Sequence, residues 1–157
     1  MAKDILSVLK EFALTRIKHL DIFKKEISLI EPQSDGFIVH GTFGKKRYYI
    51  MRTLDFEKIR NMPQEEAATV VVPNTKENFQ SLLEGWQELL KRSSLCIWFV
   101  NPYSLLEKIW IVCPSVHASI ADHASLKKGL MSMAATVELF EEITPEQAGN
   151  LVRNVGL

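Results

Sequence analysis

The basic and aromatic residues between positions 45 and 52 are the first group in this chain whose types and spacing could carry out chemistry. The group consists of Lys45, Lys46, Arg47, Tyr48, Tyr49 and Arg52. Basic side chains bind phosphate groups and aromatic rings stack on bases, so the combination is typical of contact with nucleic acid. The same residues also suit a solvated hairpin tip whose lysines protect the edge of a sheet, and we favour this simpler interpretation. If nucleic acid binds here, the expected contacts are Lys45, Lys46, Arg47, Tyr49 and Arg52.

A second group, further along the chain, contains residue types that bind zinc or act in nucleophilic catalysis. Its members are Cys113, His117, Asp122 and His123. Cysteine, histidine and aspartate are all zinc ligands, and a cysteine beside a histidine could serve as nucleophile and base. The two histidines are six residues apart, which is awkward for one helical face, and no nucleophile signature surrounds the cysteine. We therefore favour a buried cysteine with surface histidines, and we expect no catalytic residue and no cofactor.

Hydrophobic periodicity places the basic group on a hairpin. Apolar residues recur at three- and four-residue steps over residues 3–20, which predicts an amphipathic helix. Three strand-like segments follow, and we expect an antiparallel meander over residues 26–31, 37–43 and 47–53. The turn before the third strand is predicted at residues 44–46, where a glycine supplies the unusual backbone angle.

A strand–helix–strand unit is predicted after the meander. Residues 69–72 form a β-branched strand that ends at Pro73, and residues 95–100 form a continuous apolar run, which indicates a strand buried on both faces. Between these strands, Asn74 and Glu77 have the spacing of a capping box, which predicts the start of a helix. A unit of this length is expected to make a right-handed parallel crossover.

The remaining segments complete an α/β fold. Residues 55–68 are predicted to be a mobile connection, residues 109–113 a buried strand, residues 126–137 a helix, and a capping box at 144–147 opens a final helix. We predict a single α/β domain over residues 1–157: a mixed sheet with an N-terminal helix, the antiparallel meander, the parallel crossover and C-terminal helices. The predicted core consists of Leu9, Phe12, Val39, Ile50, Val71, Leu82, Leu83, Trp86, Ile97, Phe99, Ile111, Leu130 and Met133.

The composition is that of an ordinary globular protein. The chain has 157 residues, of which 46% are hydrophobic, and its 19 basic residues balance 19 acidic residues. A neutral chain lacks the overall positive field of a typical nucleic-acid-binding protein, although a local patch can still bind. Cys96 and Cys113 lie in apolar runs, so we expect small buried side chains rather than a disulfide scaffold, which suits a reducing cytoplasm. We expect neither a signal or transit peptide nor a membrane-spanning run.

The order helix, three-strand meander, helix and strand, over residues 3–113, resembles the core of the restriction-endonuclease-like (PD-(D/E)XK) nucleases. The resemblance implies a divalent metal held by an acid near the second strand and by a Glu/Asp-x-Lys motif on the third. Here residues 48–53 contain no acid, and the second strand has His40 where an acid is expected, with Asp35 in the preceding turn. Glu11 could be the helix acid that some members use, but alone it cannot hold a metal. The resemblance therefore implies a member that does not cleave.

Three classes of function follow from these observations. The leading hypothesis is a non-catalytic, nuclease-like module that binds or scaffolds nucleic acid, or a protein that processes nucleic acid. One alternative is a metal- or thiol-dependent hydrolase that uses Cys113, His117, Asp122 and His123. The other alternative is a homodimeric protein-interaction domain without chemistry.

Overall fold

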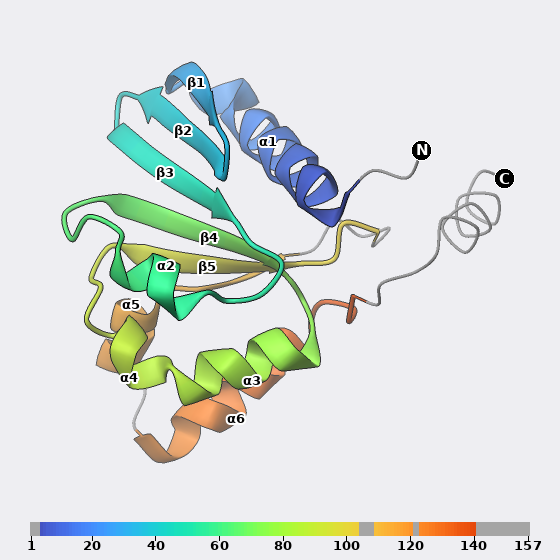
Figure 1. Cartoon of the computed structure of the whole chain (residues 1–157), viewed down its shortest axis with the longest axis vertical. Helices are drawn as coiled ribbons and strands as arrows, with labels where there is room; N and C mark the ends of the chain where they lie inside the picture. Colours follow the sequence, from blue (N-terminus) through green and yellow to red (C-terminus); the bar gives the residue numbers. More distant parts are fainter. Residues whose placement is uncertain (1–3, 104–108, 121–122, 141–157) are drawn as a thin grey trace, which may run out of the picture.

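In the part of the chain that the structure describes, a six-stranded mixed sheet has helices on both of its faces (Figure 1). Figure 1 is a computed structural model of the chain, and the residues it describes are 4–103, 109–120 and 123–140. The strands lie in the sheet in the order in which they occur in the chain, from β1 to β6. The α/β fold class predicted from the sequence is thereby confirmed, including the N-terminal helix, the meander, the parallel crossover and the C-terminal helices.

The meander comprises β1 (Ile27–Gln33), β2 (Gly36–Gly41) and β3 (Gly44–Ile50), with each neighbouring pair antiparallel. The second hairpin differs from the prediction, because its turn is formed by Thr42 and Phe43, whereas residues 44–46 already belong to β3. Gly44 adopts a positive φ of 99° directly after this turn, which glycine tolerates at little cost. The prediction correctly placed Gly44 at the reversal of the chain, but Gly44 is the first residue of β3 and not part of the turn.

The crossover joins β3, β4 (Ala67–Pro73) and β5 (Leu95–Val100), which are mutually parallel. Helices α3 (Lys76–Glu84) and α4 (Trp86–Leu89) connect β4 to β5. The last strand, β6 (Ile109–Val112), pairs antiparallel with β5. The remaining helices are α1 (Ile5–Lys24), α2 (Phe56–Arg60), α5 (Pro114–Ile120) and α6 (His123–Ala134).

Two apolar layers lie on opposite faces of the sheet. On one face, α1 packs Leu9 and Ala13 against Phe37, Val39 and other side chains of the meander. On the other face, α3, α4 and α6 cover the central strands (Figure 1), in a larger core that includes Leu82, Trp86, Leu89, Ile97, Phe99, Trp110 and Leu130. None of the helices within the described ranges is long and apolar enough to cross a membrane.

Two local predictions were wrong for reasons of tertiary packing. The cap of α3 is Thr75, whose side chain accepts a hydrogen bond from the backbone of Asn78, and not Asn74. Asn74 is instead fully buried and accepts a hydrogen bond of 3.0 Å from the indole of Trp110. Ile111, which was predicted to be in the core, is 40% exposed. It lies on edge strand β6, on the face opposite the buried residues Trp110 and Val112.

The segment 55–68 is ordered rather than a mobile connection. It contains α2, and the buried guanidinium of Arg92 donates hydrogen bonds to the backbone carbonyls of Arg60 and Met62 at 2.7 and 2.6 Å. A buried arginine with several backbone acceptors holds such a loop against the core. The predicted final helix at 144–147 lies outside the described residues.

Candidate nucleic-acid interface

The sequence-predicted basic group does not form one patch. Lys45 and Lys46 are exposed at the start of β3, and because they are neighbours in a strand their side chains point to opposite faces. The ammonium of Lys46 lies 4.4 Å from the centre of the Phe43 ring, a cation–π contact at the hairpin tip. Arg52 lies beyond the end of β3 and is exposed.

Arg47 is committed to an internal ion pair. Its Nη2 donates a hydrogen bond of 2.7 Å to Asp35 Oδ1, and Lys58 Nζ lies 3.5 Å from the other carboxylate oxygen. Burial alone would raise the pKa of Asp35, but the hydrogen bond and charge of Arg47, together with the charge of Lys58, lower it below its ordinary value. The guanidinium also lies over the Tyr49 ring, 4.9 Å from its centre. The charge of Arg47 is thus paired with a carboxylate of the same protein and is not available to a ligand.

Tyr49 is placed where a base cannot stack on it. Its side chain is only 7% exposed, and its hydroxyl donates a hydrogen bond of 2.6 Å to Glu66 Oε1. Burial and this hydrogen bond to a carboxylate raise the pKa of the Tyr49 hydroxyl, so it stays protonated and donates. Alternation along β3 places Tyr49 on the same face of the strand as Arg47.

Asp35 lies near the second strand, a position to which the sequence analysis gave little weight. It directly precedes β2, and Gly36, the next residue, lies opposite Tyr49 in the ladder. A cavity of about 360 Å³ adjoins it, lined by Asp4, Ser7, Lys10, Asp35, Ile50 and Lys58 among others. We call Asp35, Arg47 and Lys58 the Asp35 end of the meander. An acid near the second strand is therefore present, with a guanidinium from the third strand against its carboxylate.

The zinc or nucleophile group is not assembled within the described residues. Cys113 is bonded to Cys96 in a disulfide, so in this state it has no thiolate to offer a metal or a substrate. The prediction of two separate buried thiols was wrong, because both residues are partly exposed and lie opposite each other on adjacent strands. His117 donates from Nδ1 to the Cys113 carbonyl at 3.3 Å, whereas Asp122 and the His123 side chain lie outside the described part. No cluster of three potential metal ligands occurs among the side chains that the structure describes.

A basic surface that the sequence interpretation missed lies at the opposite end of β2. The β1–β2 ladder places Ile27 opposite Gly41, and the amide of Thr42 donates to the Glu26 carbonyl at 3.0 Å. The C-terminal end of α1 is thereby held beside the β2–β3 turn. The segments that meet there carry two exposed aromatic rings and four exposed lysines, of which Lys45 points to the face of β3 opposite Lys46: Phe23, Lys24, Lys25, Phe43, Lys45 and Lys46. We call this surface the helix–hairpin end.

The helix–hairpin end is hollowed. A groove of about 120 Å³ is lined by Lys24, Phe43 and Lys46 at its rim and by the side chains of Tyr48 and Trp98, among others. Phe23 is 94% exposed and Phe43 39% exposed. The neighbouring acids are Asp21, whose carboxylate accepts backbone hydrogen bonds from Glu26 and Ile27, and Glu26 itself. Glu31 also lies nearby, beside His40, the ladder partner of Lys45, so four lysines against three carboxylates leave a small excess of positive charge.

The signal for this surface was present in the sequence. The pairs Lys24–Lys25 and Lys45–Lys46 are separately unremarkable, but a β1–β2 hairpin brings the start of β1 beside the end of β2. Combining the predicted ladder with the positions of both pairs would have placed them together.

Comparison of the chain with protein-family models, with curated proteins and with solved structures finds no match in any of the three.

Proposed function

We propose that this protein is a non-catalytic nucleic-acid-binding module that uses the helix–hairpin end as its interface. The observation that carries the proposal is that the adjoining ends of α1 and the β2–β3 hairpin carry four exposed lysines and two exposed phenylalanine rings, and that Lys24, Phe43 and Lys46 line a groove there. Lysines bind backbone phosphates as point charges, and aromatic side chains stack on bases. The ion pairs Arg47–Asp35, Lys58–Asp35 and Arg60–Glu88 do not involve any of these lysines.

The Asp35 end supports the non-catalytic part of the proposal. A metal-dependent nuclease needs carboxylates that are free to coordinate a hard divalent cation. Here the Asp35 carboxylate is already neutralised by Arg47 and Lys58, and across the ladder the third strand supplies Arg47 and Tyr49 instead of acids. A cation arriving at Asp35 would have to displace two positive side chains. The order of elements resembles that of a nuclease-like core, and this electrostatic arrangement supports binding without cleavage.

The chemistry of the surface favours a single-stranded ligand. In a duplex, the faces of the bases are stacked on one another and are not available to protein side chains, whereas an unpaired strand offers them. If the ring of Phe23, which is 94% exposed, stacks on a base, that base must be unpaired. Because an exposed aromatic residue has no role in the core, its position beside lysines supports this ligand class.

The test is a fluorescence anisotropy titration with labelled single-stranded DNA and RNA and the matching duplexes, at low and physiological salt. We expect salt-dependent binding that is tighter for the single strands. Replacing Lys24, Lys25, Lys45 and Lys46 by alanine should weaken it by at least about 30-fold at low salt, since several phosphate contacts disappear together. Replacing Lys127 and Lys128, an exposed pair on α6, is the control and should change affinity less than about threefold. Absence of binding at low salt, or equal losses in both variants, would contradict the proposal.

A homodimer is the second candidate, supported by a different observation. Leu20, Ile22 and Phe23 near the end of α1 are exposed, as is Leu29 on β1. Among the described strands β1 pairs only with β2, so its other edge has no strand partner. Against edge pairing, β1 contains Pro32 and a register irregularity between Ile27 and Leu29, and both protect an edge strand from association. Light scattering decides between the states: a dimer mass that Ile22→Glu or Leu29→Glu converts to a monomer would favour this candidate.

A further inference from the structure

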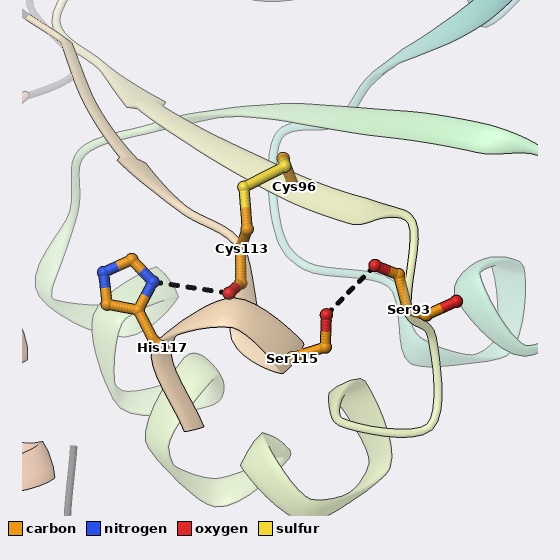
Figure 2. Close-up of a disulfide and its surroundings, with 5 residues drawn as sticks. All are labelled: Ser93, Cys96, Cys113, Ser115 and His117. Atoms are coloured by element: carbon orange, nitrogen blue, oxygen red, sulfur yellow. Dashed lines mark hydrogen bonds between the residues drawn. A yellow bond between two sulfur atoms is a disulfide. The ribbon is translucent and has the colours of Figure 1, made fainter. Parts of the chain in front are cut away.

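The disulfide between Cys96 and Cys113 joins two neighbouring strands that are already paired (Figure 2). Ile97 and Val112 are partners in the β5–β6 ladder, so the next positions outward, Cys96 and Cys113, face each other with their Cα atoms 4.1 Å apart. The hairpin register therefore brings the two sulfur atoms together, and the bond adds a link where the ladder already holds the backbones.

Packing on the other face of the sheet holds these strands independently of the bond. The rings of Phe99 and Trp110 stack with centres 4.1 Å apart, and Ile97 and Val112 are fully buried. The start of α5 has its own anchor, because the Ser115 hydroxyl donates a hydrogen bond of 3.0 Å to the Ser93 carbonyl (Figure 2). Two reduced thiols would consequently remain side by side in a folded sheet.

The pair also lies at a position that is not fully buried. Cys96 and Cys113 are both partly exposed, and Ile111, which lies on the same face of β6, is 40% exposed. Within the described residues, helix α1 makes its main backbone contacts with β3 and β4, whereas the two cysteines lie on β5 and directly after β6. Thiol–disulfide exchange requires that an attacking thiolate reach a sulfur atom, so access is the property that distinguishes an exchangeable bond from an inert buried one.

We infer that Cys96 and Cys113 form a reversible redox site that exchanges with small-molecule thiols and disulfides of the glutathione type. In the oxidative direction, one cysteine thiolate attacks a sulfur of oxidised glutathione, releasing one glutathione thiolate and forming a mixed disulfide. The second cysteine thiolate then attacks the protein sulfur of that mixed disulfide and releases the other glutathione. The protein loses two electrons and two protons, and one oxidised glutathione becomes two reduced molecules.

The test uses the full chain equilibrated at a series of ratios of reduced to oxidised glutathione, with free thiols trapped by a maleimide and counted by intact-mass spectrometry. We expect one two-electron transition, reached from both the oxidised and the reduced protein, while far-ultraviolet circular dichroism remains unchanged. The reduced protein should unfold cooperatively at a Tm about 5–10 °C lower, because only a short loop is released. A bond that opens only in denaturant, thiols that fail to oxidise in the folded protein, or loss of the fold on reduction would each overturn the inference.

Single variants separate exchange from a purely structural role. Cys96→Ser and Cys113→Ser each keep one thiol and remove the partner that resolves the mixed disulfide. Each should accumulate one stable glutathione adduct in oxidised glutathione, which the wild-type protein resolves. If neither folded variant forms the adduct, the sulfur atoms are inaccessible and the inference is wrong. If a variant does not fold, the wild-type titration decides alone.

Discussion

The two ends of β2 carry positive charge in opposite ways. At the Asp35 end, Arg47 and Lys58 surround one carboxylate, and the guanidinium is packed on the ring of Tyr49. At the helix–hairpin end, Lys24, Lys25, Lys45 and Lys46 project from the surface beside exposed rings. Lys46 and Arg47 are neighbours in the chain, yet one belongs to each end. Positive charge that is already paired maintains the fold, whereas charge that faces solvent remains available to a ligand.

The energetic reason lies in burial. The side chains of Arg47 and Asp35 are 19% and 24% exposed, so each would lose hydration without its partner. Removing one member of a desolvated pair leaves the other uncompensated, which costs more than the pair contributes as a whole. An exposed lysine suffers no such loss, because water replaces whatever it contacts.

The largest effect on stability should therefore come from Arg47→Ala. We expect a decrease of about 2–3 kcal/mol in the free energy of unfolding, because Asp35 loses its hydrogen-bond donor and Tyr49 loses its stacking partner. Lys46→Ala, one residue away, should cost less than about 1 kcal/mol. Urea denaturation of both variants measures the difference. An equal loss of unfolding free energy in both variants would show that the side chain of Arg47 stabilises the fold no more than that of Lys46 at the hairpin tip.

The pH dependence of stability should distinguish Asp35→Asn from the wild type. Because Arg47 and Lys58 lower the pKa of Asp35 in the folded state, the unfolded chain takes up the proton first as the pH falls. The stabilisation is complete above the ordinary pKa of 3.8 and is lost as the pH falls through the lower folded value. The stability difference between wild type and Asp35→Asn should accordingly shrink with acidification below that point.

Urea denaturation from about pH 6 down to about pH 2 gives this difference directly. Glu65→Gln, which neutralises an exposed carboxylate, corrects for the change in net charge. A difference that stays constant over the whole range would show that the pair is not ionised, and the distinction between the two ends would then lose its electrostatic basis.

The elements were more predictable than the contacts between them. Periodicity and turn residues located the meander and the β4–β5 crossover, because these signals are local. Asn74 was misread as a cap because its decisive partner is Trp110, 36 positions away. The pairing of Cys96 with Cys113 followed from the β5–β6 register, which no local pattern displays.

The candidate site shows the same limit. Sequence alone recognised that basic and aromatic residues cluster on the second hairpin, and it correctly placed Lys45 and Lys46 on an exposed surface. It could not separate these from Arg47 and Tyr49, since only the fold supplies Asp35 and Glu66 as partners. Nor did it join the end of α1 to the hairpin turn, because that contact depends on the β1–β2 ladder.

The smallest expected effect concerns the salt dependence of the proposed binding. It compares one lysine from each end of β2 directly. If Lys45 neutralises one phosphate, Lys45→Ala should reduce the slope of log K against log salt by about 0.7 for a single strand. Lys58→Ala removes the same charge at the Asp35 end, and because that charge faces Asp35 rather than the ligand, the slope should not change. Titrations at four or five salt concentrations measure both slopes. A change in the Lys58 slope as large as that for Lys45 would mean that overall charge, and not the helix–hairpin end, attracts the nucleic acid.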